Sequence, residues 1–226
     1  APGSPVALPR SSLLHRALIY ASRVAVRLYF RTRAQGLERL PKGPFILAPN
    51  HQSFFDGLFV IAHMRPHAVL RTLFYAKAKH VERLWLSAVA RRSNVVVMRK
   101  GENLLQSLQA LAAGLRRGDN VMIFPEGTRS AGGNLGPFKE SYAILARALS
   151  VPVVPVVIDG AHRVLPTGSW LPRLLGRISV TYLDPVWPRV GESVAALNQR
   201  VHDVVAAQLA FDRSQRSCGV VGADGA

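Results

Sequence analysis

Short runs of consecutive apolar residues alternate along the chain with stretches in which apolar side chains return every three or four positions. The apolar runs are typical of buried strands and cover residues 45–49, 69–76, 94–98, 121–124, 151–158 and 178–183. Helical spacing covers residues 11–30, 58–62, 80–90, 102–117, 139–148 and 194–209. This alternation predicts an α/β fold, a single domain with a mostly parallel central sheet flanked by helices.

The chain is expected to divide into three parts. Residues 1–34 would form an N-terminal arm and an amphipathic helix, residues 35–210 the α/β domain, and residues 211–226 a flexible tail. No run approaches the ~20 apolar residues that a membrane span requires. Arginines interrupt the apolar part of the N-terminal segment, which is unlike a signal peptide. Because the chain lacks an initiating methionine, it is expected to be processed or to be a piece of a longer protein.

The first predicted helix has an apolar stripe with arginines on the opposite side. The stripe contains Leu14, Leu18, Ala21, Ala25 and Leu28, and the arginines are Arg16, Arg23 and Arg27. Acidic residues are absent before Glu38. A basic amphipathic helix of this kind is typical of a segment that lies in a membrane interface. The alternative is an ordinary surface helix that packs on the core of the domain.

The net charge of +16 favours anionic partners such as nucleic acids, acidic lipid head groups or phosphorylated substrates. Nucleic acid is not expected as a partner, because the sequence has no stacking-aromatic motif or recognition signature. The single cysteine, Cys218, excludes a disulfide within the chain. A metal site is not expected either, since no Cys/His cluster has the spacing of metal ligands.

His51 and Asp56 lie in the segment between an apolar run and the start of a helix, where α/β proteins usually place their chemistry. Residues five apart do not align on a regular helix, but a turn can bring Asp56 back to the ring of His51. A carboxylate on one ring nitrogen fixes the tautomer and leaves the other nitrogen free as a base. The alternative is a helix N-terminus capped by Asn50 or Ser53, with no role for His51.

Two more polar clusters follow apolar runs. Glu126, Gly127, Thr128 and Arg129 come after residues 121–124, and Arg99 with Lys100 comes after residues 94–98. If the strands are parallel, their carboxyl ends meet at one edge of the sheet, the usual ligand edge. Taken alone, Glu126 and Arg129 would more often form a surface ion pair. The alternative for Arg99 and Lys100 is a pair of solvated charges at the end of a strand.

The segments Asn50-His51-Gln52-Ser53-Phe54-Phe55-Asp56-Gly57 and Phe124-Pro125-Glu126-Gly127-Thr128-Arg129-Ser130 together resemble the glycerolipid acyltransferase family. That family carries His-x4-Asp and Phe-Pro-Glu-Gly-Thr-Arg-Ser in this order. The resemblance covers roughly residues 35–187. It is partial at Arg99, where Met98 replaces a frequent acidic residue, and after Phe138-Lys139, where Glu140 and Ser141 replace a frequent glycine.

The run at residues 151–158 matches the family's fourth block and contains Pro152 and Pro155. Because proline cannot donate to a strand ladder, this run is not expected to be a regular central strand. The resemblance implies that Pro155 shapes the wall of an acyl or head-group pocket.

The resemblance implies transfer of a fatty acyl chain from acyl-CoA or acyl carrier protein to 1-acylglycerol-3-phosphate, giving phosphatidic acid in phospholipid biosynthesis. His51 would be the base and Asp56 would orient it. The implied substrate-binding residues are Arg99, Lys100, Glu126, Gly127, Thr128, Arg129 and Pro155. The reaction needs no protein nucleophile and no cofactor other than the acyl donor.

Several alternatives stay open within and beyond this family. The acceptor could be glycerol-3-phosphate or another lysophospholipid, and a non-catalytic lipid-binding scaffold on the membrane is a different class. The partners that the resemblance implies are membrane phospholipids, acyl-CoA or acyl carrier protein, and lysophosphatidic acid. The expected location is the cytoplasmic face of a membrane, with the chain bound at its surface.

Overall fold

The computed structural model describes residues 13–77, 95–98, 104–130, 132–164, 173 and 175–221. Its centre is a seven-stranded sheet in the order β1-β7-β6-β2-β5-β3-β4. The strands are β1 (Arg31–Gln35), β2 (Ile46–Pro49), β3 (Thr72–Lys77), β4 (Val95–Met98), β5 (Asn120–Met122), β6 (Val153–Asp159) and β7 (Arg177–Tyr182). The strands from β6 to β4 are mutually parallel, whereas β7 is antiparallel to β6 and parallel to β1. The predicted single-domain α/β fold with a mostly parallel sheet is confirmed.

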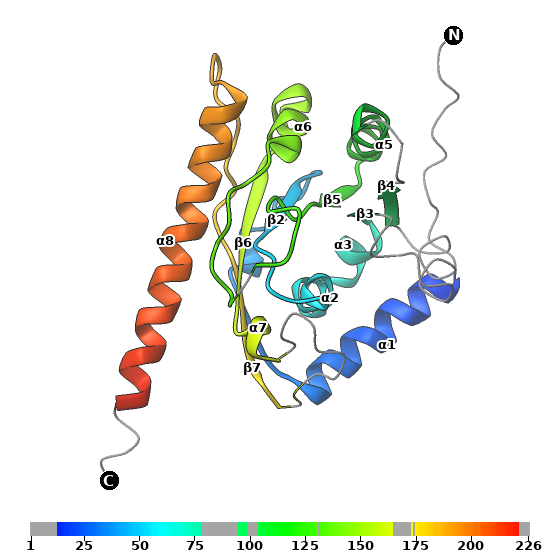
Figure 1. The fold of residues 1–226 in the computed structure, drawn as a ribbon. Coiled ribbons are helices and arrows are strands. Elements are labelled where there is room, and N and C mark those ends of the chain that lie inside the picture. The colour runs from blue at the N-terminus through cyan, green and yellow to red at the C-terminus, as the bar shows by residue number, and fades with distance from the viewer. Residues whose placement is uncertain are drawn as a thin grey trace.

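Helices cover both faces of the sheet (Figure 1). One face is covered by α1 (Leu13–Tyr29), α2 (Asp56–Ala62), α3 (Pro66–Leu70) and α7 (Ala161–Val164). The other is covered by α5 (Leu104–Arg117), α6 (Ser141–Leu149) and α8 (Val194–Val221). A short 3-10 helix, η1 (Leu37–Arg39), joins β1 to the segment before β2. In the part of the chain that the structure describes, no helix is long and apolar enough to cross a membrane.

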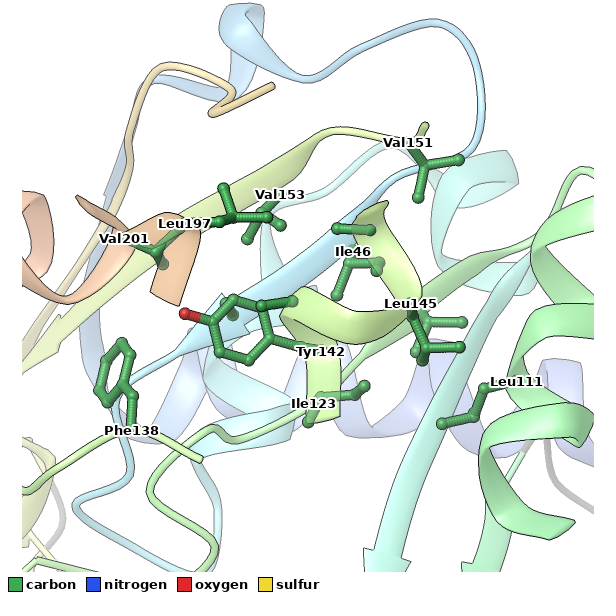
Figure 2. Close-up of a cluster of buried hydrophobic side chains, with 14 of the residues drawn as sticks. Ile46, Leu111, Ile123, Phe138, Tyr142, Leu145, Val151, Val153, Leu197 and Val201 are labelled. Carbon is green, nitrogen blue, oxygen red and sulfur yellow. The ribbon is translucent and has the colours of Figure 1, made fainter. Parts of the chain in front are cut away.

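The β2 strand is buried on both sides, as the central strand of a parallel sheet must be. Ile46 and Ala48 face the core under α5, α6 and α8, and Leu47 faces the core under α1 and α2. Figure 2 shows Tyr142 of α6 among the side chains of the core under α5, α6 and α8. Its hydroxyl donates to the backbone carbonyl oxygen of Asn198 in α8 (3.4 Å). The two helices therefore contact each other on the face of the sheet that includes β2.

The expectation that the run around Pro155 is not a regular central strand was wrong. β6 has strands on both sides, with Ala48 of β2 opposite Pro155. The ring nitrogen of Pro155 lies on the side of β7, at the point where that pairing ends after Tyr182. The carbonyl oxygen of Pro155 still accepts a hydrogen bond from the backbone N–H of Leu183 (3.0 Å). The missing donor therefore falls at the end of a ladder, where its loss is small.

Element boundaries differ from the predicted ones at both ends of the chain. β1 was not predicted, because its sequence has no run of large apolar residues; it places residues 31–35 in the sheet and thus moves the start of the domain to Arg31. The α8 helix does not end near Leu209 but continues to Val221. Residues 211–221 are therefore helical and do not form the tail that their composition suggested. The predicted helix at residues 80–90 lies outside the described residues.

The segment at residues 66–70 is helical, although an apolar run predicted a strand from residue 69. Pro66 is the first residue of α3, a position where its fixed φ suits a helix and its missing N–H costs nothing. The strand β3 follows at Thr72, where the chain joins the sheet beside β5.

Candidate active site

Asn50 directly follows β2, at the point where the chain leaves the sheet. Its side-chain Nδ2 donates to the carbonyl oxygen of Ile158 (2.9 Å), and the backbone N–H of Ile158 donates to its Oδ1 (2.6 Å). The side-chain amide of Asn50 thus extends the pairing with β6 beyond the end of β2. It leaves the next residue, His51, beyond the carboxyl end of the sheet, at the usual ligand edge of an α/β fold.

His51 and Asp56 form a hydrogen-bonded pair. Nδ1 of His51 donates to Oδ2 of Asp56 (2.9 Å), and the same oxygen accepts the backbone N–H groups of Gln52 (2.5 Å) and Ser53 (2.8 Å). Asp56 is the first residue of α2 and is fully buried. The predicted turn therefore brings the two side chains together. The alternative in which Asn50 or Ser53 caps a helix without a role for His51 does not account for this contact.

The surroundings of this pair act on the pKa of Asp56 and on the orientation of the His51 ring. Burial raises the pKa of Asp56, and the hydrogen bonds from His51 and from the backbone of Ser53 and Gln52 oppose that rise. The backbone N–H groups of Gln52 and Ser53 and the ring nitrogen Nδ1 of His51 converge on Oδ2 of Asp56, so Nδ1 is engaged by the carboxyl and Nε2 takes no part in this contact. The ring of His51 also stacks on Phe124, with centroids 4.2 Å apart. The ring of His51 is thus held in one orientation, with Nδ1 toward Asp56.

Glu126 supports the backbone of the same turn. Its Oε1 accepts the backbone N–H of His51 (2.7 Å), and its Oε2 accepts the backbone N–H of Gly136 (3.0 Å). The backbone N–H of Ser130 donates to the carbonyl oxygen of His51 (2.7 Å). Glu126 is buried, so the loop after β5 holds His51 through its peptide groups on both sides. Glu126 therefore joins two loops, a structural contact that the resemblance did not suggest.

Replacing Glu126 by glutamine is expected to change the pH dependence of stability. Burial raises the pKa of Glu126, and hydrogen bonds from the backbone of His51 and Gly136 oppose the rise. Between about 4.3, the pKa of glutamate in an unfolded chain, and the raised value, the folded protein binds more protons than the unfolded chain. The contribution of Glu126 to stability therefore falls as the pH rises through this window, and Glu126→Gln lacks that loss.

Urea unfolding of both proteins at several pH values tests this expectation. The midpoint of wild type relative to Glu126→Gln should fall as the pH is raised from about 4 to about 7. Every other titrating group is shared by the two proteins, so the difference isolates Glu126. A difference that stays constant over this range would show that its pKa is not raised.

The remaining predicted residues fall into three groups. Gly127, Thr128 and Arg129 lie on the loop that holds His51. Gly127 has a positive φ of 68°, Thr128 is exposed and Arg129 is half-buried. Pro155 is buried within β6, below the edge from which His51 projects. The predictions for Arg99 and Lys100 concern residues outside the described part of the chain. β4, which ends just before them, has its carboxyl end on the same edge of the sheet.

Sequence reasoning missed a second set of polar groups beside the His51 turn. Its members are Gln52, Gly133, His162 and Arg213. Gln52 stood within the matching segment but had no partner that spacing could reveal, and the other three residues are 80 or more positions away from it along the chain. Within the described residues, no group of three or more His, Cys, Asp or Glu side chains could hold a metal ion.

The sequence and the fold of this chain are both similar to those of known proteins. The sequence model of the acyltransferase family matches residues 31–159. A chloroplast 1-acyl-sn-glycerol-3-phosphate acyltransferase of Brassica napus is 31% identical over 157 residues, which cover 68% of this chain and 44% of that protein. The corresponding protein of Pseudomonas aeruginosa is 29% identical over 204 residues, covering 86% of this chain and 74% of the relative. The chain thus spans less than half the length of the plant protein.

A solved structure shares the fold as well. The crystal structure of the 1-acyl-sn-glycerophosphate acyltransferase of Thermotoga maritima is 25% identical, has a TM-score of 0.74, and covers 88% of this chain and 80% of its own. The family match spans more than half of the sequence and includes both the His51 turn and the Glu126 loop. On these grounds, the chain belongs to the acyltransferase family.

Proposed function

We propose that this chain transfers a fatty acyl chain from a thioester to the free hydroxyl of 1-acylglycerol-3-phosphate and so forms phosphatidic acid. The observation that carries the proposal is the His51–Asp56 pair, which leaves Nε2 of His51 free as a base at the ligand edge of the sheet. The names of the Brassica napus, Pseudomonas aeruginosa and Thermotoga maritima relatives support this acceptor.

In the proposed reaction, the acceptor oxygen attacks the thioester carbonyl carbon while Nε2 of His51 takes the hydroxyl proton. The tetrahedral intermediate then collapses, the carbon–sulfur bond breaks, and the imidazolium returns the proton to the leaving thiolate. Asp56 stabilises the imidazolium through the hydrogen bond to Nδ1. General base catalysis of this kind contributes about 10²–10⁴-fold to the rate. The arrangement is the base and orienting half of a serine-hydrolase triad, with the acceptor hydroxyl in place of serine.

Arg129 is the proposed contact for the acceptor's phosphate, together with Arg99 and its neighbour Lys100. Arg129 is half-buried on the loop whose next residue, Ser130, donates to the backbone carbonyl oxygen of His51. The planar guanidinium of arginine offers several N–H donors that suit a phosphate. Support for Arg99 and Lys100 comes from the sequence, where they directly follow β4, a strand whose carboxyl end lies on the same edge of the sheet as the His51 turn. Acyl-CoA and acyl carrier protein are both compatible with the positive charge of the chain.

The experiment that tests this function is a matrix of acyl donors and acceptors. Purified protein is assayed with acyl-CoA and with acyl carrier protein against 1-acylglycerol-3-phosphate, a lysophosphatidylethanolamine and glycerol-3-phosphate. We expect the highest kcat/KM with 1-acylglycerol-3-phosphate. A higher value with either other acceptor would reassign the acceptor. A protein that binds vesicles of these lipids but transfers no acyl chain from either donor would be a lipid-binding scaffold.

We also propose that α1 binds the membrane surface. Its outward face is apolar and exposed, with Leu13 at 83%, Val24 at 55% and Leu28 at 71% exposure. This face contains members of the predicted apolar stripe, whereas the domain is contacted by the other side of the helix. Arg23 was expected beside Arg16 and Arg27 on the polar side of α1. It is instead buried against α2 and donates to the carbonyl oxygens of Ala62 (3.2 Å) and Met64 (2.5 Å).

Two substitutions on this outward face test the membrane proposal. The double variant Val24→Glu/Leu28→Glu is expected to reduce binding to vesicles that contain phosphatidylglycerol by about 10-fold or more. Each apolar side chain contributes about 1.5 kcal/mol or more when it leaves water, and 1.4 kcal/mol corresponds to a factor of ten. Ile144→Glu on α6 is the matched control, because Ile144 is also an exposed apolar residue on a helix. Equal losses in both proteins, measured by vesicle sedimentation, would contradict a specific role for α1.

A further inference from the structure

The loop of residues 132–136 lies against the His51 turn and is held there at several points. The carbonyl oxygen of Gly133 accepts hydrogen bonds from Nε2 of Gln52 (3.3 Å) and from Nη2 of Arg213 (2.6 Å). Nη1 of Arg213 also donates to Oδ1 of Asn134 (3.4 Å). Through Gly136, the same loop donates to Glu126. A single backbone carbonyl thus joins the candidate active site to the C-terminal helix α8.

Gln52 connects this loop to the catalytic pair. It follows His51 directly, its side chain is buried, and its backbone N–H donates to Oδ2 of Asp56. Because its Nε2 faces the Gly133 carbonyl, its Oε1 must face the other side, where Nδ1 of His162 lies 3.2 Å away. Any shift of the Gly133 carbonyl therefore moves a side chain whose own backbone orients Asp56.

The position of Arg213 is set by the C-terminal helix α8. It lies in α8, near the end that the sequence predicted to be a flexible tail. One turn further on, Arg216 pairs with the buried carboxylate of Asp159, the last residue of β6. This ion pair attaches the end of α8 to the same edge of the sheet as the His51 turn. From this helix the guanidinium of Arg213 reaches Gly133 and Asn134 of the loop.

We propose that Arg213 is a positioning residue for the acyl transfer proposed above, on which this inference rests. It fixes the Gly133 carbonyl, which fixes Gln52, which in turn keeps Asp56 and His51 aligned. Arg213 donates to Gly133 and Asn134, and Gly133 in turn accepts from Gln52, so the proposed action of Arg213 passes through the loop and Gln52. The last turns of α8 therefore belong to the active-site architecture.

The first test replaces Arg213 by glutamine and by lysine. We expect Arg213→Gln to lower kcat by roughly 10- to 100-fold, the range that a small misplacement of catalytic groups produces, with KM changed by less than about 2-fold. Arg213→Lys keeps a charged donor for the Gly133 carbonyl and should recover part of kcat. Its partial recovery distinguishes a lost hydrogen bond from a loss of folded protein.

Arg200→Gln is the matched control on the same helix. Arg200 also holds a loop from α8, by donating to the carbonyl oxygen of Trp187 (2.9 Å) and to Glu192, and both of these partners lie outside the His51 turn. We expect Arg200→Gln to lower the melting temperature without lowering kcat. If Arg213→Gln and Arg200→Gln have the same kcat, or if Arg213→Lys is no better than Arg213→Gln, the inference is overturned.

A pair of glycine variants tests the same loop without touching α8. Gly132 and Gly133 both have positive φ, 64° and 80°, so an alanine at either position carries a similar backbone strain. A Cβ on Gly132 meets open space, whereas a Cβ on Gly133 would lie 2.5 Å from Nδ1 of His162. Gly133→Ala is expected to lower kcat by at least about 10-fold more than Gly132→Ala. Equal losses would contradict a role for the contact between this loop, Gln52 and His162.

A spectroscopic measurement separates this inference from the proposed function. The proton on Nδ1 of His51 gives a low-field NMR signal while its hydrogen bond to Asp56 is held. We expect this signal to broaden or shift upfield in Arg213→Gln and to be unchanged in Arg200→Gln. The comparison needs no substrate, so it decides the inference even if wild type transfers no acyl chain. An unchanged signal in Arg213→Gln would overturn the positioning role.

Discussion

Replacing His51 by alanine is expected to lower kcat for acyl transfer by about 10²–10⁴-fold. The acceptor hydroxyl is too weak an acid to attack a thioester at neutral pH without a base. Nε2 of His51 is the nitrogen that the hydrogen bond from Nδ1 to Asp56 leaves free. The stacking of the ring on Phe124 aligns that nitrogen before substrate binds. Removal of the ring therefore removes both the proton acceptor and its orientation.

The loss should appear without a loss of folded protein. The His51 side chain is 19% exposed and lies at the edge of the sheet, outside both cores. Its backbone contacts with Glu126 and Ser130 do not depend on the ring. Circular dichroism and vesicle binding should match wild type, and KM should change less than kcat. Near-wild-type kcat in His51→Ala would show that another group is the base and that the proposed mechanism is wrong.

Asp56→Asn is expected to have the second largest effect, a fall in kcat of up to about 10⁴-fold, the loss that the same change causes in a serine-protease triad. The amide carries no charge, so it cannot stabilise the imidazolium that forms as the hydroxyl is deprotonated. Its NH2 group must also occupy one of two unsuitable places. It either faces the N–H groups of Gln52 and Ser53, or takes the position of Oδ1, which has no hydrogen-bond partner among the described residues.

Stability should respond much less than activity to Asp56→Asn. Burial raises the pKa of Asp56, which means that ionisation of this carboxyl is less favourable in the folded protein than in the unfolded chain. The neutral amide avoids that cost, and this gain offsets part of the hydrogen bonding that is lost, about 1–3 kcal/mol for an unsatisfied buried group. The measurement is kcat beside the urea midpoint at neutral pH. A variant that keeps at least a tenth of wild-type kcat would exclude Asp56 as the group that orients and charges the base.

The parts of this protein that were predictable are those that depend on neighbours in the chain. Apolar runs and helical spacing located six of the strands and most helices, because burial on a sheet or on one helix face is a local requirement. His51 and Asp56 are five residues apart, so the turn between them was sufficient to predict their contact. The Glu126 loop was recognised from its own residues, although its hydrogen bond to the backbone of His51 was not foreseen.

Where local patterns were weak or ambiguous, tertiary contacts decided the outcome. β1 has no apolar run and exists because it pairs with β7, nearly 150 residues later. Pro155 is tolerated in a central strand because its nitrogen falls where a neighbouring strand ends. Arg23 looked like part of a polar helix face, but the carbonyl groups at the end of α2 hold it inside the protein.

The same distinction applies at the candidate active site. The contact between His51 and Asp56 was predicted from residue types, spacing and the family resemblance, whereas Gln52, Gly133 and Arg213 meet only in the folded chain. Arg213 bonds to a backbone carbonyl, and every residue carries one, so no pattern of side chains could reveal its partner. Residues 211–221 have a composition typical of a tail, yet they are helical. In this part of α8, Arg213 bonds to the loop and Arg216 pairs with Asp159 of β6. Local sequence therefore specified the reactive groups, while packing of α8 against the sheet edge decided what holds them in place.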